Sequence, residues 1–280
     1  MPKLFPLKLS ELYREYAAIF RKNGFDSPEV EAAYLLADLS GISHTLVPFS
    51  PLSPGPELLR NAGTRLARRL RGEPYQYICG WAAFRELRLS VGPGCLIPRP
   101  ETELLVDRIL AVLPENGRFC EWGTGSGAIA LSVAFERPDA DVSGSELSPE
   151  ALAWAERNRM DLQLSQVRLK MGDLGRPFAG ERFHVIAANL PYIAFEEKNS
   201  LPVNVREWEP PEALFAAENG LALLDRAIRE APLFLEPGGH LLLEIGETQG
   251  AHLLETAERW AQAEIAQDQY GADRFFIGTP

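Results

Sequence analysis

The sequence predicts an α/β fold preceded by a small all-helical domain, and three observations carry this prediction. Strand and helix patterns alternate from about residue 100 to the C-terminus, which is typical of a mostly parallel sheet with helices on both faces. The first 75 residues show helical patterns only. Between the two regions, apolar and polar side chains alternate as in a β-hairpin. We expect a helical domain over 1–78, a β-hairpin linker over 79–98 and an α/β domain over 99–280.

Three helices are expected in the helical domain. Ser10 is a candidate N-cap for the first, which ends near Asn23-Gly24. Ser27-Pro28 combines a cap with a first-turn proline and begins the second. The third runs from about Glu57 to Leu70, and shorter helical pieces are expected over 42–50.

The linker is predicted as a hairpin from its alternating apolar residues, Phe84, Leu87, Leu89 and Val91. Gly92-Pro93-Gly94 is expected to supply the turn, because glycine and proline favour turn geometry.

The α/β domain is predicted from repeated strand and helix patterns. The last two strands have no helix between them, so one strand of the sheet should be antiparallel. The expected strands are 118–121, 140–144, 167–171, 184–188, 240–244, 265–268 and 274–277. The expected helices are 126–135, a helix capped by Ser148 that ends near 158, 221–235 and 249–262.

Composition indicates a folded protein of a reducing, cytoplasmic compartment. Hydrophobic residues make up 46% of the 280 residues, which is ordinary for a globular chain. No run of about 18 apolar residues occurs, so no membrane-spanning helix is expected. Cys79, Cys95 and Cys120 lack a paired spacing, which fits reduced thiols. The four histidines form no ligand pattern, so we expect no metal site.

The charge balance argues against a broad surface for nucleic acid. The net charge is −11. Residues 1–80 carry 10 Lys/Arg and 8 Asp/Glu, a balance of +2, whereas residues 81–280 carry 18 and 31, a balance of −13. Several arginines between Arg65 and Arg71 form a candidate basic patch, although a solvated helix face is the favoured interpretation.

A glycine-rich loop, Glu121 to Gly127 (E-W-G-T-G-S-G), follows the first expected strand of the α/β domain. Ligands bind at the carboxyl ends of such strands, and glycine allows the backbone to approach them closely. The loop alone could hold NAD or form a structural turn. Its G-x-G-x-G spacing and the acidic Glu121, which would attract a cation and repel a pyrophosphate, favour S-adenosylmethionine.

Two more segments follow neighbouring strands and could complete this cofactor site. Glu146 could accept hydrogen bonds from both hydroxyls of a ribose. The alternative is a helix N-terminal charge beside the Ser148 cap. Gly172-Asp173-Leu174 follows the next strand, where a base edge or an apolar wall would lie.

Asn189-Leu190-Pro191-Tyr192 follows a buried-strand pattern and predicts a site for a planar NH2 group. The Asn189 side-chain oxygen and the Leu190 carbonyl can accept its N–H bonds, Pro191 restrains Leu190 to extended geometry, and the Tyr192 ring can pack on its plane. A tight turn is the alternative. Together with the glycine loop, the motif predicts methyl transfer to an amide or amine nitrogen, with Asn189, Pro191 and Tyr192 as catalytic residues.

Motifs along nearly the whole chain are shared with a known family. The most specific is L-I-P-R-P-E-T-E, from Leu96 to Glu103. The others are E-P-x-x-Y-I-x-G from Glu73, E-P-x-x-A-L-F-x-x-x-N-G-L from Glu209 and L-E-I-G from Leu243. In these motifs the chain resembles the HemK/PrmC family of peptide chain release factor glutamine N5-methyltransferases.

This resemblance implies a class I, Rossmann-like methyltransferase domain with seven strands and an N-terminal domain that binds the release factor. It implies S-adenosylmethionine as the methyl donor, S-adenosylhomocysteine as the product and the glutamine of the release factors' Gly-Gly-Gln loop as the acceptor. Asn189, Leu190, Pro191 and Tyr192 would hold the glutamine. By position, the cofactor residues would be Gly123, Thr124, Gly125, Ser126, Gly127, Glu146, Asp173, Leu174 and Asn189.

Two departures from the family pattern keep alternatives open. Leu190 replaces the first proline of N-P-P-Y, and N-L-P-Y also resembles the motif of rRNA adenine dimethylases. Glu146 replaces an aspartate, which lengthens the carboxylate arm by one carbon. An adenine-N6 methyltransferase acting on RNA or DNA, and a cofactor-binding protein without activity, are therefore the competing hypotheses. The matches outside the motif favour glutamine, and no direct nucleic-acid binding is expected.

Overall fold

The computed structural model describes residues 7–280, which divide into two compact units with a boundary between Gly80 and Trp81. Each unit has its own hydrophobic core. The division places the hairpin that we predicted as a linker over 79–98 in the second unit, because Phe84, Leu87 and Leu89 belong to the core of that unit.

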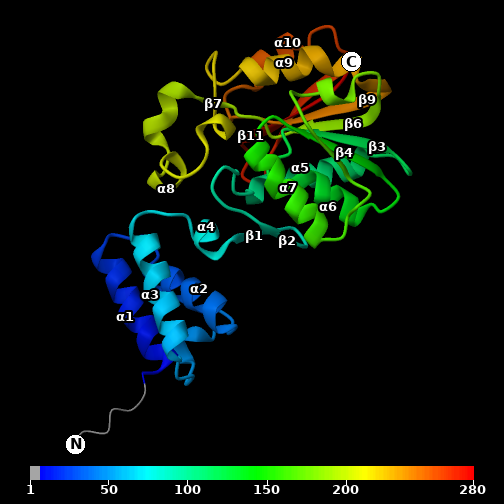
Figure 1. The fold of residues 1–280 in the computed structure, drawn as a ribbon. Coiled ribbons are helices and arrows are strands. Elements are labelled where there is room, and N and C mark those ends of the chain that lie inside the picture. Colours follow the sequence, from blue (N-terminus) through cyan, green and yellow to red (C-terminus); the bar gives the residue numbers. More distant parts are fainter. Residues whose placement is uncertain (1–6) are drawn as a thin grey trace, which may run out of the picture. The chain divides into compact units, whose positions relative to one another are not determined.

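The first unit is built from helices (Figure 1), as the sequence predicts. Its helices are α1 (Leu9–Lys22), α2 (Pro28–Ser40), the short 3-10 helix η1 (Val47–Phe49), α3 (Pro56–Leu70) and α4 (Tyr75–Cys79). Ser10 is not the cap of α1, because the helix begins one residue earlier and Lys8 is its N-cap. The Glu11 carboxylate accepts the hydrogen bond of the Lys8 N–H at 2.8 Å. Ser27 and Gly41 flank α2 as expected.

The hairpin of the second unit consists of β1 (Trp81–Phe84) and β2 (Leu87–Ser90), which are antiparallel. The prediction that Gly92-Pro93-Gly94 forms its turn was wrong, because the chain turns at Arg85, whose φ is +49°. Glu103 accepts the Arg85 N–H at 3.0 Å, and Glu136 binds its guanidinium at 2.6 Å, which holds this conformation. Gly92 instead makes room for Trp154, since a Cβ there would lie 2.5 Å from that ring.

A seven-stranded sheet forms the centre of the second unit, in the order β10-β11-β9-β6-β3-β4-β5 (Figure 1). Only β11 runs antiparallel to its neighbours, and it lies between β9 and β10. The α/β class with one antiparallel strand is therefore confirmed. The strands are β3 (Arg118–Trp122), β4 (Asp141–Glu146), β5 (Arg168–Met171), β6 (Phe183–Ala188), β9 (Leu235–Glu244), β10 (Gln262–Gln267) and β11 (Asp273–Thr279).

Both faces of the central strands are buried, because each strand contributes alternate residues to two cores. On β6, Val185 and Ala187 belong to one core, and Ile186 and Ala188 to the other. The first core packs against α5 (Pro100–Val112) and α6 (Ala128–Glu136), and the second against α9 (Ala222–Glu230) and α10 (Gly250–Thr256) (Figure 1). Such near-continuous apolar strands are typical of parallel sheets with helices on both sides.

Several elements differ from the sequence prediction. Helix α5 was missed, although Pro100 and the acidic Glu101 and Glu103 in its first turn are typical of a helix start. Helix α7 (Pro149–Asp161) begins as expected, because the Ser148 hydroxyl accepts the Ala151 N–H at 3.3 Å. The segment after β6 was not predicted; it contains β7 (Ile193–Ala194), η3 (Phe195–Ser200), α8 (Val203–Arg206), η4 (Pro211–Ala213) and β8 (Phe215–Ala216). Short 3-10 helices also occur at η2 (Arg176–Phe178) and η5 (Ala231–Leu233).

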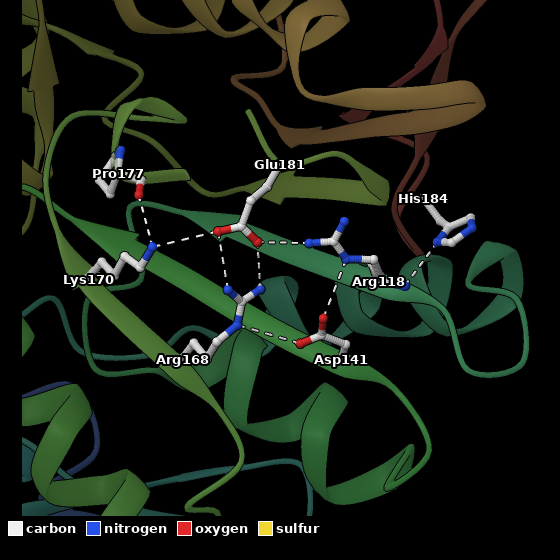
Figure 2. Close-up of polar contacts among 7 residues, drawn as sticks. All are labelled: Arg118, Asp141, Arg168, Lys170, Pro177, Glu181 and His184. Carbon is white, nitrogen blue, oxygen red and sulfur yellow. Dashed lines mark hydrogen bonds and ion pairs between the residues drawn. The ribbon is translucent and has the colours of Figure 1, made fainter. Parts of the chain in front are cut away.

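A network of charged side chains holds the first residues of β3, β4 and β5 together (Figure 2). The Glu181 carboxylate accepts hydrogen bonds from Arg118 at 2.8 Å and Arg168 at 3.0 Å, and Asp141 lies 3.4 Å from Arg118. Arg168, whose hydrogen bonds act most strongly, holds the pKa of Glu181 below its usual range. The network fixes the edge of the sheet opposite the carboxyl ends of the same strands.

Candidate active site

The glycine loop connects β3 to α6 and has left-handed backbone geometry at three positions. Gly123, Gly125 and Gly127 have φ values of +75°, +57° and +85°. A Cβ added at Gly125 would meet no atom within 4 Å, so this residue borders open space, whereas one at Gly127 would lie 2.7 Å from Leu131. Thr124 and Ser126 are buried, with 3% of each residue exposed, and contribute backbone to the same loop. The loop is shaped to let a ligand approach its backbone.

Glu146 lies at the end of β4 and fixes the loop. One carboxylate oxygen accepts the Gly125 N–H at 2.8 Å, and the other accepts the Ser148 N–H, also at 2.8 Å. Each carboxylate oxygen can accept more than one hydrogen bond, so both can also meet a pair of hydroxyls. Glu146 thus joins the loop to the start of α7 and borders the same cavity as Gly125.

Glu121 differs from the sequence expectation of a charged group beside the loop. It is buried, and one of its oxygens accepts hydrogen bonds from the Thr124 hydroxyl at 3.0 Å and the Ala130 N–H at 2.8 Å. Burial raises the pKa of Glu121 to about 8, so its carboxyl group is mostly protonated at pH 7. The repulsion of a pyrophosphate that we expected from its charge is therefore weak in the free protein.

Asp173 and Leu174 border the cavity from the other side. The Ser145 hydroxyl donates a 2.7 Å hydrogen bond to the Leu174 carbonyl, and the Leu174 side chain is buried. Arg226 binds the Asp173 carboxylate at 2.9 Å, so this carboxylate already has a cationic partner. Leu174 thus borders the cavity after the third strand, where the sequence analysis expects a base edge or an apolar wall.

The Asn189-Leu190-Pro191-Tyr192 motif follows β6 directly and is held by buried partners. The Asn189 side-chain NH2 donates to the Thr102 hydroxyl at 3.0 Å, and the Tyr192 hydroxyl donates to Glu244 at 3.3 Å. Burial raises the pKa of Tyr192 above its usual range, so the phenol remains protonated. The Leu190 side chain is 5% exposed and packs in the core, so it contributes more than the carbonyl that the sequence analysis assigned to it.

Two cavities meet at Asn189 and Leu190. The first, which we call the loop cavity, is bordered by Gly123, Gly125, Glu146, Asp173, Leu174 and Pro191 as well as these two residues. The second, the motif cavity, is bordered by Leu96, Arg99, Tyr192, Ile193, Leu201, Val205 and Glu244 together with the same two. The structure therefore brings all of the predicted segments to one place, with Asn189 in the lining of both cavities.

Three residues of this site had no role in the sequence analysis. Thr102 and Glu244 are 4% and 2% exposed, and they form hydrogen bonds with Asn189 and Tyr192 of the motif. Arg99 borders the motif cavity and binds Glu209 at 2.5 Å, while Glu209 also accepts the Ile97 N–H at 3.0 Å. All lie in the motifs quoted above, but their partners are more than 50 positions away in the sequence, so spacing alone did not identify the contacts.

We expect Arg99→Ala to lower the free energy of unfolding by about 3 kcal/mol, because it leaves the Glu209 carboxylate buried without its cationic partner. The Glu209 side chain is 1% exposed and that of Arg99 is 30% exposed. Urea unfolding measures the loss. Arg157→Ala is the matched control, since the side chains of Arg157 and its partner Asp161 are both about 60% exposed. This variant should change the free energy of unfolding by less than about 0.5 kcal/mol. Equal effects of the two variants would contradict this account.

Gly220→Ala should destabilise the motif through a direct clash. Gly220 has a φ of +83°, and a Cβ there would lie 2.0 Å from the Tyr192 carbonyl oxygen, which accepts a 2.8 Å hydrogen bond from Gln249. We expect a loss of more than about 2 kcal/mol in thermal or urea unfolding, since the left-handed geometry alone costs about 1–2 kcal/mol. Gly238→Ala is the control, because Gly238 has a φ of +78° and open space around it. A Gly220→Ala variant as stable as Gly238→Ala would refute the clash.

Among residues 7–280, no group of three or more His, Cys, Asp or Glu side chains is arranged to hold a metal ion. Within the same range, no helix is both long enough and apolar enough to cross a membrane.

Comparison with known proteins identifies relatives over nearly the whole chain. A family model of the PrmC N-terminal domain matches residues 11–80, and a model of a methyltransferase domain matches residues 113–272. Release factor glutamine methyltransferases of Salmonella typhimurium and Neisseria gonorrhoeae are 37% and 40% identical to the chain. The first alignment covers 94% of this chain and 96% of the relative, and the second 90% and 93%.

The fold also matches a solved structure. A methyltransferase from Pyrococcus furiosus superimposes with a TM-score of 0.53 at 20% identity, covering 77% of this chain and 98% of that one. At this identity the likeness concerns the fold alone.

Proposed function

The chain belongs to the family of release factor glutamine methyltransferases, and from this premise we propose that it transfers a methyl group from S-adenosylmethionine to the side-chain nitrogen (N5) of the glutamine in the release factors' Gly-Gly-Gln loop. The single observation that carries the proposal is the position of Asn189 where the loop cavity and the motif cavity meet. We further propose that the protein acts in the cytoplasm, which its protein substrate and its three free cysteines support.

The residues of the loop cavity fit S-adenosylmethionine. Gly125 leaves open space beside the loop, Glu146 can accept the two ribose hydroxyls, and Leu174 offers an apolar wall for the adenine. The bound cofactor supplies an electrophilic methyl group on a sulfonium. Glu146 also holds the Gly125 N–H, so the residue that accepts the ribose shapes the loop beside it.

The residues of the motif cavity fit a primary amide. An amide nitrogen is a poor nucleophile, because its lone pair is delocalised into the carbonyl group. The Asn189 side-chain oxygen and the Leu190 carbonyl would accept its two N–H bonds, and the Tyr192 ring would pack on its plane. Orientation of this kind can lower a barrier by roughly 7–11 kcal/mol, so no strong base is needed at the nitrogen.

Binding of the cofactor should release a proton near neutral pH. Glu121 borders a small cavity shared with Gly123, Gly125 and Asn189, and its pKa in the free protein is about 8. The cationic groups of the cofactor favour the carboxylate and so lower this pKa. Affinity should therefore rise with pH from 6.5 towards 8 and level off above it. Calorimetry in buffers of different ionisation enthalpy measures the proton released.

Glu121→Gln provides the control for this prediction. The variant should bind the cofactor more weakly, without net proton release and with a flat affinity over the same pH range. If the wild type and Glu121→Gln release the same number of protons, Glu121 is not the titrating group.

The proposed function is tested with radiolabelled S-adenosylmethionine and either a release factor or RNA as the acceptor. We expect label on the release factor and none on RNA, in keeping with the balance of −13 over residues 81–280. Label on RNA alone would replace the proposal with an adenine-N6 methyltransferase. Label on neither, with intact cofactor binding, would support a binding protein without activity.

A further inference from the structure

A buried chain of hydrogen bonds lies behind the Asn189 side chain. Asn189 donates to the Thr102 hydroxyl at 3.0 Å, and Thr102 donates to one oxygen of Glu244 at 2.6 Å. The other oxygen of Glu244 accepts the Tyr192 hydroxyl at 3.3 Å. Glu244 lies at the end of β9 and Thr102 in the first turn of α5, so two elements distant in sequence reach the same motif.

The chemistry of this chain fixes which way its protons point. In the structure the Thr102 hydroxyl donates its single hydrogen to Glu244 at 2.6 Å, so none is left for Asn189. The Thr102 oxygen can then only accept from Asn189, which turns the Asn189 NH2 inward. The Asn189 side-chain oxygen then faces the loop cavity and the motif cavity. With the opposite orientation, an NH2 group would face the NH2 of a substrate amide, donor against donor.

We propose that Thr102 and Glu244 are positioning residues that hold the Asn189 side-chain oxygen towards the substrate amide. This inference rests on the proposed function. Burial raises the pKa of Glu244 above its usual range, and the hydrogen bonds from Thr102 and Tyr192 and the charge of Arg274 offset part of this rise. One carboxylate thus fixes both the amide and the aromatic ring of the motif.

Substitutions at Thr102 test the inference most cleanly. Thr102→Val keeps the shape of the side chain and removes its hydroxyl. The Asn189 side-chain amide can then flip, so that its oxygen and its NH2 group exchange places. We expect kcat for release-factor methylation to fall by about 100-fold, by analogy with the loss of one oriented polar group in other active sites. Thr102→Ser keeps the hydroxyl and should stay within threefold of the wild type. The dissociation constant of S-adenosylmethionine, measured by calorimetry, should change by less than threefold in both variants.

Glu244→Gln adds a graded outcome. A glutamine can meet Thr102 with its oxygen or with its NH2, and only the second arrangement reverses the Asn189 amide. The loss in kcat should therefore lie between those of Thr102→Ser and Thr102→Val. Ser132→Ala is the matched control, because the Ser132 hydroxyl is buried without a hydrogen-bond partner and should not affect kcat.

Three results would overturn the inference: wild-type kcat in Thr102→Val, equal losses in Thr102→Val and Thr102→Ser, or a loss of cofactor affinity as large as the loss of kcat. Circular dichroism and thermal unfolding establish that each variant folds. If Glu244→Gln does not fold, the comparison of Thr102→Val with Thr102→Ser still tests the inference. Failure of the proposed function is distinguishable, because the wild-type protein itself would then leave the release factor unmethylated.

Discussion

Asn189→Ala is expected to reduce methyl transfer to the release factor by about 100- to 1,000-fold while S-adenosylmethionine still binds within a few fold of the wild type. The substitution removes the side-chain oxygen that would accept a substrate N–H, and losses of about 100- to 1,000-fold are typical when one such group is removed. The Thr102 hydroxyl loses the N–H that it accepts from Asn189 but keeps its hydrogen bond to Glu244. Single-turnover methylation gives the rate, and calorimetry gives the cofactor affinity.

Asn199→Ala is the matched control for this experiment. Asn199 is exposed in η3, a few residues beyond the motif, and its removal should leave both quantities unchanged. A loss of cofactor affinity in Asn189→Ala as large as its loss of rate would show that Asn189 acts through the cofactor and would contradict its role at the acceptor.

Glu146→Ala should have the complementary effect and weaken cofactor binding by about 100-fold or more. It removes the acceptor of the two ribose hydroxyls and leaves the N–H groups of Gly125 and Ser148 without the partners they have at 2.8 Å. Each unsatisfied buried N–H costs about 1–3 kcal/mol, and the glycine loop loses the contact that shapes it. Calorimetry with S-adenosylmethionine or S-adenosylhomocysteine measures the change.

Glu150→Ala controls for the loss of a carboxylate near the start of α7. Glu150 is exposed in the first turn of the helix, so the variant should bind the cofactor within about threefold of the wild type. Should Glu146→Ala bind as tightly as Glu150→Ala, Glu146 would be a helix-terminal charge, which is the alternative that the sequence left open.

The central strands of the sheet could be predicted from the sequence, because they are buried on both faces and their apolar runs stand out. Helix α7 was predicted from the Ser148 cap, which the structure contains. The turn at Arg85 could not be predicted from local signals, since contacts with α5 and α6 hold its left-handed geometry. The segment over 193–216 lacks a regular apolar period, because its elements are two to six residues long.

The candidate site was predicted in outline but not in its supporting contacts. The glycine loop and the Asn189 motif follow strands directly, so the rule that ligands bind at the carboxyl ends of strands located them. Burial raises the pKa of Glu121 to about 8, and residue type alone does not reveal this burial. The contact of Thr102 with Glu244 spans 142 positions, and no spacing within a motif indicates it.

The central claim is that the protein places a methyl group on one side-chain amide nitrogen of a release factor. The most direct test is tandem mass spectrometry of the release factor after incubation with S-adenosylmethionine and the protein. The account predicts a gain of one methyl group, located on the glutamine of the Gly-Gly-Gln loop and absent when that glutamine is replaced by alanine. A methyl group on any other residue, or one that persists in the alanine variant, would contradict it.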